Sequence, residues 1–552
     1  MRLRTLLGTL LLLPLLLLSF GPTFLPSSDT AAAVDPPTSC STQTTKCVKG
    51  LLLAYWLNNG GAERLGFPIS DEFDEPNMDG KTHRVQYFER TRLEYHQEFV
   101  NTPSVVLQGL IGREQFAARY PTGRPAPPAT GDQCFAETGR CITGGFRNYW
   151  QQNGGVAQFG FPLSDEFDEP SGGQAAHVQY FERARFEYHP EVAGTRGEVT
   201  LGLVGTEALA TKYPNGQPAP ATGLAINVWA NTKAGMPYPA PVANLAARVY
   251  VPDELAGNVT VIDPSNFQVI DRYPTGRTAH HASPSPDFAH LYVENMGSST
   301  LSEIDTQTGK VTRNIGAAVP YNLYFTTDGT KGVVAAEPQN SLDFYDPQSW
   351  GLIQRVLIPC SGVDHMDMSA DGRYLLVGCE FDGQVFKVDT VNMRILGSVR
   401  VGGQPIDVKV APDGSVFYVA NQTRNGVSVI DPIAMREIAF LPTGTGAHGF
   451  AVSRDTNYLY VTNRVAGTIS VLEFATNTVV NTWNIGGSPD MVQVSPDGSQ
   501  LWTSGRFNGE VYVVDTRTGA LMQRIRTGIA PHGLTYFPQP GVISIGHNGV
   551  YR

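Results

Sequence analysis

From about Arg248 to the C-terminus, short segments that alternate apolar and polar residues recur at a fixed step. Each unit holds four such segments, as in VSVI, FKVD and VYVV, separated by turn residues that include an aspartate, which stands within Pro-Asp-Gly in two units. Alternation with period 2 predicts β-strands that have one buried face. The acid that ends the alternating strand recurs in steps of 42, 41, 43, 42, 42 and 42 residues, at Asp263, Asp305, Asp346, Asp389, Asp431, Glu473 and Asp515.

A constant step of this size, with four strands per step, is typical of a β-propeller blade. Seven sets of the second, third and fourth strands can be counted, and the segment at about His532–Phe537 supplies a last first strand. We therefore predict a mainly β protein in which residues 245–552 form a seven-bladed β-propeller whose final strand completes the first blade. A solenoid is the alternative, but the sequence lacks the capping units that a solenoid needs.

Two motifs, YVTN at Tyr460–Asn463 and YVAN at Tyr418–Asn421, occur with GGSPDMVQVSPDG at Gly486–Gly498. Together they resemble the YVTN family of seven-bladed propellers. The resemblance extends over the whole C-terminal part and implies the same fold. It implies no single activity, because that family and its relatives include surface proteins as well as lactonase-like and nitrite-reductase-like propellers.

Residues 1–33 have the pattern of a secretory signal peptide. A positive start, MRLR, precedes an apolar run to about Phe20, and the alanines at 31–33 offer a cleavage site. The alternative is an uncleaved anchor, although the run is short for a membrane span. The sequence contains no second run of that length. We therefore expect no membrane span after signal removal, and a secreted protein that can be associated with the cell envelope.

An internal duplication lies between the signal and the propeller. GFPISDEFDEP at Gly66–Pro76 recurs 94 residues later as GFPLSDEFDEP, and VQYFERTRLEYH at Val85–His96 recurs as VQYFERARFEYH. We predict two small α+β modules at residues 40–121 and 134–214, each with a short helix around its Tyr-Trp pair and a hairpin at VQYFER. A Pro-rich linker at residues 215–244 is expected to act as a spacer to the propeller.

The Gly-Phe-Pro segment, which follows a Gly-Gly loop in both modules, resembles the LGFP-type repeat of bacterial envelope proteins. The chain departs from that repeat where Glu-Arg replaces a later glycine. The resemblance implies that the modules bind a cell-wall or matrix polysaccharide. The alternative is that their aromatic residues only build small hydrophobic cores.

Four of the six cysteines form a repeated pair with equal spacing, Cys40 with Cys47 and Cys134 with Cys141. No histidine or further cysteine stands at zinc-site spacing beside them, so we predict a disulfide within each pair. Cys360 and Cys379 lie in the propeller, and the sequence leaves open whether they pair.

The net charge of −11 and a pI of about 5.5 disfavour nucleic acid as a partner. The sequence has no CxxCH motif and so no site for a covalently attached c-type haem. It also lacks a nucleophile elbow and a phosphate-binding glycine loop.

The innermost strands of a propeller begin at the mouth of the central channel. Seven positions before the turn acid of each blade, with Gln539 as its equivalent in the last, the sequence predicts a ring at this mouth that contains His280, Tyr321, Asp364, Ile406, His448, Asp490 and His532. The next position adds His281, Asn322, His365 and Asp407, and loops on the same face add Arg464 and Arg506.

Imidazole and carboxylate groups at one level suit a transition metal such as Cu, Zn, Fe or Mn. We therefore predict a metal site from His280, Asp364, His448, Asp490 and His532. The other polar residues of the ring are predicted to contact a ligand, namely His281, Tyr321, Asn322, His365, Asp407, Arg464 and Arg506. A polar funnel without metal and a purely structural ring are the alternatives.

Two functions stay open at this point, and the sequence does not decide whether the protein is an enzyme. The first is a secreted or cell-surface binding protein, which the modules tether and whose propeller binds a small polar ligand or a protein at the channel mouth. The second is an extracellular metal-dependent enzyme, an oxidoreductase or a lactonase-like hydrolase, with its centre on the propeller axis.

Overall fold

The computed structural model describes residues 35–124, 131–171 and 174–552. The predicted signal peptide lies outside these residues. Within the described ranges, no helix is long and apolar enough to cross a membrane.

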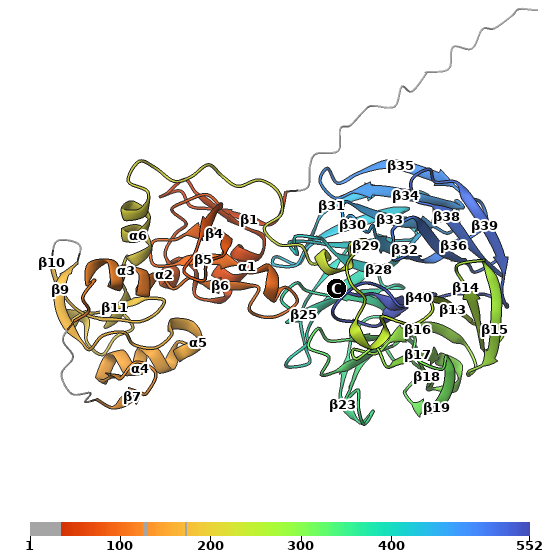
Figure 1. Cartoon of the computed structure of the whole chain (residues 1–552), viewed down its shortest axis with the longest axis horizontal. Coiled ribbons are helices and arrows are strands. Elements are labelled where there is room, and N and C mark those ends of the chain that lie inside the picture. Colours follow the sequence, from red (N-terminus) through yellow and green to blue (C-terminus); the bar gives the residue numbers. More distant parts are fainter. Residues whose placement is uncertain (1–34, 125–130, 172–173) are drawn as a thin grey trace, which may run out of the picture. The chain divides into compact units, whose positions relative to one another are not determined.

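Seven four-stranded antiparallel sheets occupy residues 248–537, arranged around a common centre (Figure 1). The first joins β13 (Arg248–Asp253), β14 (Asn258–Asp263) and β15 (Gln268–Pro274) to the last strand, β40 (Thr535–Phe537). Residues Tyr536 of β40 and Val249 of β13 are paired, so the two ends of the propeller are joined as predicted. The mainly β fold and its propeller are thereby confirmed.

Each of the other six sheets holds four consecutive strands. In chain order the strands are β16 (Ala279–Pro284), β17 (His290–Asn295), β18 (Thr300–Asp305), β19 (Lys310–Gly316), β20 (Asn322–Phe325), β21 (Gly332–Ala336), β22 (Ser341–Tyr345), β23 (Leu352–Leu357), β24 (Val363–Met368), β25 (Tyr374–Cys379), β26 (Gln384–Asp389), β27 (Arg394–Arg400), β28 (Pro405–Val410), β29 (Phe417–Asn421), β30 (Gly426–Asp431), β31 (Arg436–Pro442), β32 (Ala447–Val452), β33 (Tyr458–Asn463), β34 (Thr468–Glu473), β35 (Thr478–Asn484), β36 (Pro489–Val494), β37 (Gln500–Gly505), β38 (Glu510–Asp515) and β39 (Leu521–Arg526).

The hydrophobic core of the propeller lies between neighbouring sheets. Val429 of β30 and Leu459 of β33, for example, belong to one cluster and are fully buried. Burying such faces is the main stabilising contribution to the fold, at about 25 cal/mol for each Å² of apolar surface. The polar ends of the innermost strands are left to line the centre.

The two N-terminal modules repeat one arrangement, as predicted. Each has a two-stranded hairpin, two helices, a four-stranded sheet and a final helix. The first contains β1 (Thr38–Cys40), β2 (Cys47–Lys49), α1 (Gly50–Asn58), α2 (Gly61–Leu65), β3 (Phe73–Pro76), β4 (Thr82–Tyr87), β5 (Arg92–Tyr95), β6 (Val106–Gln108) and α3 (Ile111–Arg119). The second contains β7 (Gln133–Phe135), β8 (Arg140–Ile142), α4 (Gly144–Gln152), α5 (Gly155–Phe159), β9 (Phe167–Ser171), β10 (Gln174–Tyr180), β11 (Arg185–Tyr188), β12 (Val199–Leu201) and α6 (Val204–Lys212).

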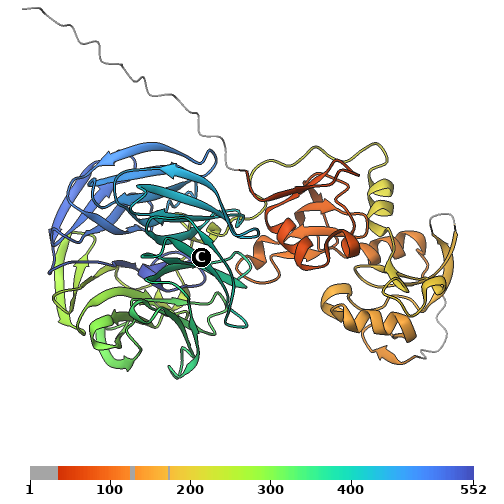
Figure 2. The ribbon, with the colours of Figure 1, turned by 180° about the vertical axis from the view of Figure 1, so that it is seen from behind.

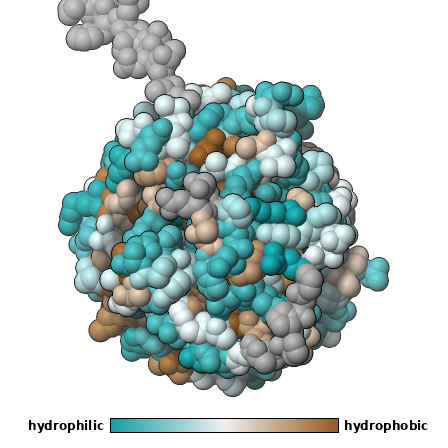
Figure 3. Space-filling model, turned by 90° about the vertical axis from the view of Figure 1, so that its left-hand side faces the viewer, coloured by the Kyte–Doolittle hydropathy of each residue, from teal (hydrophilic) through white to brown (hydrophobic). Residues whose placement is uncertain are grey.

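The final helix of each module reaches across to the other module. In α6, Val204 and Ala208 are buried in the core of the first module, and Tyr213, just after α6, donates a hydrogen bond of 2.6 Å to Glu75. Tyr120, just after α3, makes the equivalent 2.6 Å bond to Glu169 of the second module. The surface at this end of the chain is mostly hydrophilic, with hydrophobic residues in small separate patches (Figure 3).

Residues 215–244, predicted as a spacer, contact the propeller closely. Val228 donates a backbone hydrogen bond of 2.8 Å to Pro412, and the Trp229 indole donates one of 3.2 Å to Val410. Both side chains are buried. The segment contains only two short 3-10 helices, η3 (Ala230–Thr232) and η4 (Ala240–Val242).

After β40 the chain turns into the centre of the propeller, and both Figure 1 and Figure 2 show the C-terminus among the sheets. This C-terminal segment, residues 538–552, includes η7 (His547–Gly549) and a bridge between Gly546 and Tyr324 of β20. Arg552 is fully buried, donates a 2.8 Å bond to the Met368 carbonyl and forms an ion pair with Asp367.

The predicted disulfides Cys40–Cys47 and Cys134–Cys141 are both present and are confirmed. Each one links the two strands of a module's hairpin. Cys360 and Cys379, which the sequence left open, form a third disulfide within the propeller.

Candidate functional site

A shared backbone irregularity places the candidate residues at the start of the innermost strands. In β16, Ala279 pairs with Asn295 and the next regular pair is Ala282 with Val293, so one extra residue is accommodated. The same shift occurs at the start of β24, β28, β32 and β36. A bulge of this kind bends the strand and redirects side chains, so two consecutive residues such as His280 and His281 can both face the centre.

Six histidines gather in the centre of the propeller, each at most 2% exposed. They are His280, His281, His365, His448, His532 and His547. The Nδ1 atoms of His280 and His532 are 3.2 Å apart. His365 Nδ1 and His547 Nε2 are also 3.2 Å apart.

His281 lies between these two pairs. Its ring centroid is 4.7 Å from both His280 and His532, 5.1 Å from His365 and 5.0 Å from His547. Its Nδ1 is 2.9 Å from the Asn548 side-chain oxygen, which accepts the hydrogen bond. The three-residue groups that could hold an ion are His280–His281–His532, His281–His365–His547 and His448–Asp490–His532 within this centre.

Several buried polar atoms of the centre have no hydrogen-bond partner among the described residues. They are His281 Nε2, His365 Nε2, His448 Nδ1, His532 Nε2, Asp490 Oδ2 and both carboxylate oxygens of Asp364. A buried polar group without a partner costs about 1–3 kcal/mol, so native proteins seldom leave several together. These atoms are imidazole nitrogens and carboxylate oxygens, the donor types that transition metals bind. The residues present therefore fit a metal.

Burial keeps the imidazoles neutral. Desolvation lowers the pKa of His281 to about 3, and desolvation together with the nearby Arg464 lowers that of His448 to about 4. The pKa values of His280, His365, His532 and His547 are also lowered well below the ordinary value, again mainly by desolvation. Neutral imidazoles have lone pairs available, which is the state that binds metal ions.

Asp490 is the ionised group of the centre. Burial opposes its ionisation, but Arg464 and His448 outweigh burial and hold its pKa below the ordinary value. Arg464 Nη2 lies 2.7 Å from Asp490 Oδ1, and His448 Nδ1 lies 2.8 Å from the same oxygen. Arg464 also contacts His448 Nε2, whereas His448 Nδ1 makes no hydrogen bond of good geometry among the described residues.

The structure brings together most of the ring residues that the sequence singles out. The rings of Tyr321 and His280 are tilted against each other with centroids 4.2 Å apart, and the Asn322 side chain makes hydrogen bonds to two imidazoles. Asp364 lies 3.1 Å from His365 Nε2 but belongs to none of the histidine-rich groups of the described centre. Burial, with Glu380 and Glu337 nearby, raises its pKa well above the ordinary value and so favours its neutral form.

Two ring positions have other roles. Ile406 is a buried apolar residue. Asp407 accepts backbone hydrogen bonds of 2.8 Å from Val408 and from Phe450, and so links adjacent innermost strands instead of joining the histidines. At the rim, Arg506 pairs with Glu254 at 2.5 Å, with 21% of the arginine side chain exposed.

Sequence reasoning missed His547 and Asn548. They lie in the C-terminal segment, beyond the last repeat, where no spacing argument applies. The available signal was a histidine in a segment without a strand pattern, SIGHNGV, immediately after a propeller that ends with its own closing strand.

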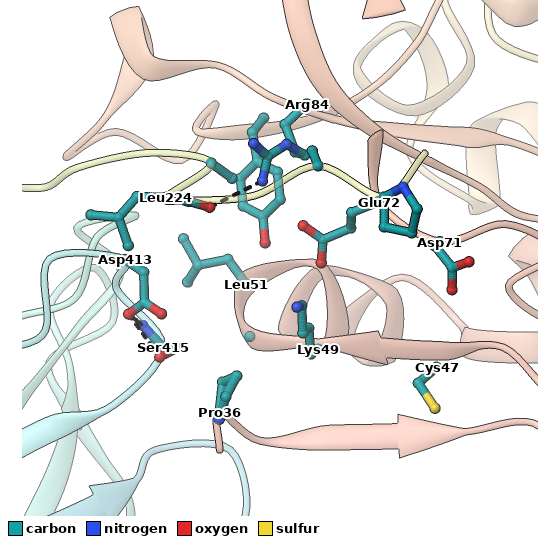
Figure 4. Close-up of a pocket in the computed structure, with 16 residues that line it drawn as sticks. Pro36, Cys47, Lys49, Leu51, Asp71, Glu72, Arg84, Leu224, Asp413 and Ser415 are labelled. Atoms are coloured by element: carbon teal, nitrogen blue, oxygen red, sulfur yellow. Dashed lines mark hydrogen bonds between the residues drawn. The ribbon is translucent and has the colours of Figure 1, made fainter. Parts of the chain in front are cut away.

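A cavity of about 500 Å³, which none of the six histidines lines, is shown in Figure 4. It is lined by Lys49, Leu51, Glu72 and Arg84 of the first module, Leu224 of the following segment, and Asp413 and Ser415 of the propeller. Arg84 donates a 3.2 Å hydrogen bond to the Gly223 carbonyl at its wall. Burial raises the pKa of Glu72.

Three solved structures are similar to part of this chain at low identity. Hydrazine synthase of Kuenenia stuttgartiensis has 19% identity and a TM-score of 0.41, covering 46% of this chain and 87% of the other. A functionally unknown protein of Desulfotomaculum acetoxidans DSM 771 has 17% and 0.48, covering 52% and 98%, and the dihydro-heme d1 dehydrogenase NirN in complex with DHE has 16% and 0.43, covering 60% and 85%.

No curated protein matches the sequence. A family model described as YNCE-like beta-propeller matches residues 221–539, which is more than half of the chain and includes part of the segment that precedes β13. This chain belongs to the YNCE-like beta-propeller family.

Proposed function

We propose that this protein is an extracellular metal-dependent enzyme whose metal is held by histidines on the propeller axis. The observation that carries the proposal is the group of six buried, neutral imidazoles, of which His281, His365 and His532 each have an Nε2 atom without a hydrogen-bond partner among the described residues. A purely structural ring would be expected to satisfy these atoms within the protein. Three disulfides among the described residues are consistent with an extracellular location.

The donor set narrows the choice of metal. Imidazole suits copper, zinc and iron, whereas manganese prefers sites rich in carboxylate. Asp490 supplies one ionised carboxylate, and Asp364 favours its neutral form, so the centre is poor in negative charge. Copper or iron would give an oxidoreductase and zinc a lactonase-like hydrolase. We favour the oxidoreductase with copper, because copper binds nitrogen donors most tightly among the divalent first-row metals.

The test is metal analysis by mass spectrometry of the full chain, as purified and after incubation with Cu²⁺ or Zn²⁺ followed by removal of excess metal. We expect at least one bound ion per chain, lost in the His280→Ala/His532→Ala double variant. His290→Ala is the matched control, because His290 lies on β17 outside the centre and should leave the metal content unchanged. Wild-type protein that stays metal-free after incubation would refute the proposal.

A second proposal concerns the N-terminal modules, which we infer tether the protein to a cell-wall or matrix polysaccharide. The resemblance to LGFP-type repeats supports it, as does the polar cavity lined by Lys49, Glu72 and Arg84 (Figure 4). The full chain should cosediment with isolated cell wall, and Lys49→Ala/Glu72→Ala should reduce the bound fraction. Equal cosedimentation with and without cell wall would remove the tethering role and leave the metal proposal untouched.

We also propose that the propeller is of the seven-bladed YVTN type. The motifs at Tyr460–Asn463 and Tyr418–Asn421 support it, together with the seven sheets. We likewise propose that the modules at residues 40–121 and 134–214 and the linker at residues 215–244 are separate functional units. Removal of the tether by proteolysis between the modules and the propeller should release a propeller that keeps its metal.

A further inference from the structure

A small cavity lies where the propeller, the segment before it and the C-terminal segment meet. It has a volume of about 40 Å³. The propeller lines it with Lys409 of β28, Arg454 of the turn between β32 and β33, and Gln493 of β36. Trp229 of the preceding segment and Tyr551 of the C-terminal segment line it as well. A space of this size has room for a few water molecules or for one small ion.

Lys409 is a buried cation without a partner. It is 3% exposed, and among the described residues its side chain makes no ion pair and no hydrogen bond. Lysine is almost never fully buried unless it is paired, because the ammonium group loses its hydration. Asp407 lies near it, but both oxygens of Asp407 accept backbone hydrogen bonds of 2.8 Å. Desolvation raises the pKa of Asp407 to about 6, although the charge of Lys409 opposes this rise.

Arg454 is a second cation at the cavity. Within the part of the chain that the structure describes, its guanidinium donates hydrogen bonds to neutral oxygens only. These are the carbonyls of Thr232, Val494 and Ser495, at 3.2, 2.9 and 3.1 Å, and the side-chain oxygen of Gln539. Desolvation lowers the pKa of Arg454 to about 10, so the group stays charged at neutral pH. Asp497 opposes this shift, but it lies in an exposed turn where solvent screens its charge.

The charges around the cavity do not balance. The Arg552 guanidinium lies 5.0 Å from the centroid of the Trp229 ring, and its charge is compensated by the ion pair with Asp367. Asp407 is then the one remaining buried carboxylate beside two cations, Lys409 and Arg454. One positive charge is left in excess. A buried charge without compensation is costly, and a bound anion would remove that cost.

We propose that this cavity binds a small inorganic anion, with Lys409 and Arg454 as its charge partners. The volume of the cavity favours chloride over the larger phosphate. Because Val550 and Tyr551 line the same cavity, the anion would hold the C-terminal segment against the propeller. None of the six histidines lines the cavity, so the site does not require that the histidines bind metal.

The test is thermal unfolding of the full chain, first in a buffer whose anion is a sulfonate too bulky for the cavity. Replacing that anion by chloride at constant ionic strength should raise the Tm of wild type by about 2–4 °C, because a ligand of the folded state stabilises it. Lys409→Met keeps the length of the side chain without its charge and should not respond. Lys387→Met is the matched control and should respond like wild type, because Lys387 has its own acceptor, the Pro432 carbonyl at 2.8 Å.

Phosphate in place of chloride distinguishes the kind of anion. We expect a smaller rise in Tm than with chloride, and this rise should also be lost in Lys409→Met. A larger rise that Lys409→Met abolishes would still support the site and would assign it to an oxoanion. A rise of equal size in wild type and Lys409→Met would be a general salt effect and would overturn the proposal.

The Tm values without chloride give a second criterion. If Lys409 serves only to compensate Asp407, Lys409→Met should be less stable than wild type in the sulfonate buffer, and this result would overturn the proposal. We expect the variant to be at least as stable there, because it lacks the excess charge.

Hydrogen exchange of wild type decides the matter even if Lys409→Met does not fold. Chloride should slow the exchange of backbone amides at residues 229–232 and 545–552 in particular. No change, or an equal change throughout the propeller, would overturn the anion site and leave the proposed metal site untouched.

Discussion

Glu294 is a buried acid whose replacement should stabilise the protein in a pH-dependent way. It lies on β17, is fully buried, and neither carboxylate oxygen has a hydrogen-bond partner among the described residues. The nearby Ser283 hydroxyl donates to the Leu323 carbonyl at 2.9 Å. Desolvation by burial raises the pKa of Glu294 from 4.5 to about 8, so the folded protein holds this group neutral at pH 7.

The sign and size of the pH dependence of stability follow from proton linkage. In the unfolded chain Glu294 ionises above pH 4.5, so folding must take up a proton at neutral pH. Each pH unit above that value costs about 1.4 kcal/mol, until the folded group itself ionises near pH 8. The stability that is fully present below pH 4.5 is therefore reduced by about 3 kcal/mol at pH 7. Glu294→Gln keeps the shape and is neutral in both states, so it should remove this loss.

The assay is thermal unfolding of wild type and Glu294→Gln at pH 4.5 and at pH 7.5. The variant should unfold at a higher temperature than wild type at pH 7.5, and the difference should shrink towards zero at pH 4.5. Glu303→Gln is the matched control with the opposite sign, because desolvation of Glu303 is outweighed by hydrogen bonds from Arg313 and Thr312 together with nearby positive charge, which lower the pKa of Glu303. A Glu294→Gln effect of equal size at both pH values would refute the reasoning.

Three further substitutions test other parts of the fold. Replacing Cys360 and Cys379 by Ala opens a disulfide with a sequence separation of 19 and should cost about 3 kcal/mol of unfolding free energy, measured by denaturation in urea. Gly205→Val should displace α6 from the first module and increase protease sensitivity in the modules, because a Cβ at this position would lie 1.8 Å from a backbone oxygen. Gly316→Ala is the control, because a Cβ there meets nothing within 4 Å. Arg552→Met should cost about 3–5 kcal/mol by leaving a buried aspartate unpaired, and should expose the C-terminal segment to carboxypeptidase; unchanged stability would contradict a firm anchor.

The sequence predicts the propeller because the signals for it are local and repeated. The acids that mark the period accept hydrogen bonds within their own turns, as Asp305 does from the Thr308 amide at 2.7 Å and Asp346 from the Gln348 amide at 2.9 Å. Each blade repeats these turns, so a regular spacing of acids reports a regular spacing of strands. The disulfides of the modules follow in the same way, because each pair closes a short hairpin.

Contacts between distant segments could not be predicted in this way. The exchange of α3 and α6 depends on glycines, Gly112 and Gly205, that allow a close approach to the backbone of the other module. Such an approach leaves no periodic signal. The burial of Trp229 against Val410 and of Arg552 against Asp367 likewise joins residues from unrelated parts of the chain.

The histidine centre depends partly on a signal that repeats in each blade and partly on a contact between distant segments. A strand with period 2 would turn only one of two consecutive residues to the channel. The bulge at the start of β16 and β24 removes that limit, and it occurs equally in β28, where Asp407 only accepts backbone hydrogen bonds. The irregularity is therefore a general feature of these blades that some of them use for chemistry. The scaffold offers two neighbouring positions per blade, and side-chain identity decides which blades bind. His547 enters from outside this scheme, because the propeller is already closed by β40 and the centre is filled by the segment that follows it.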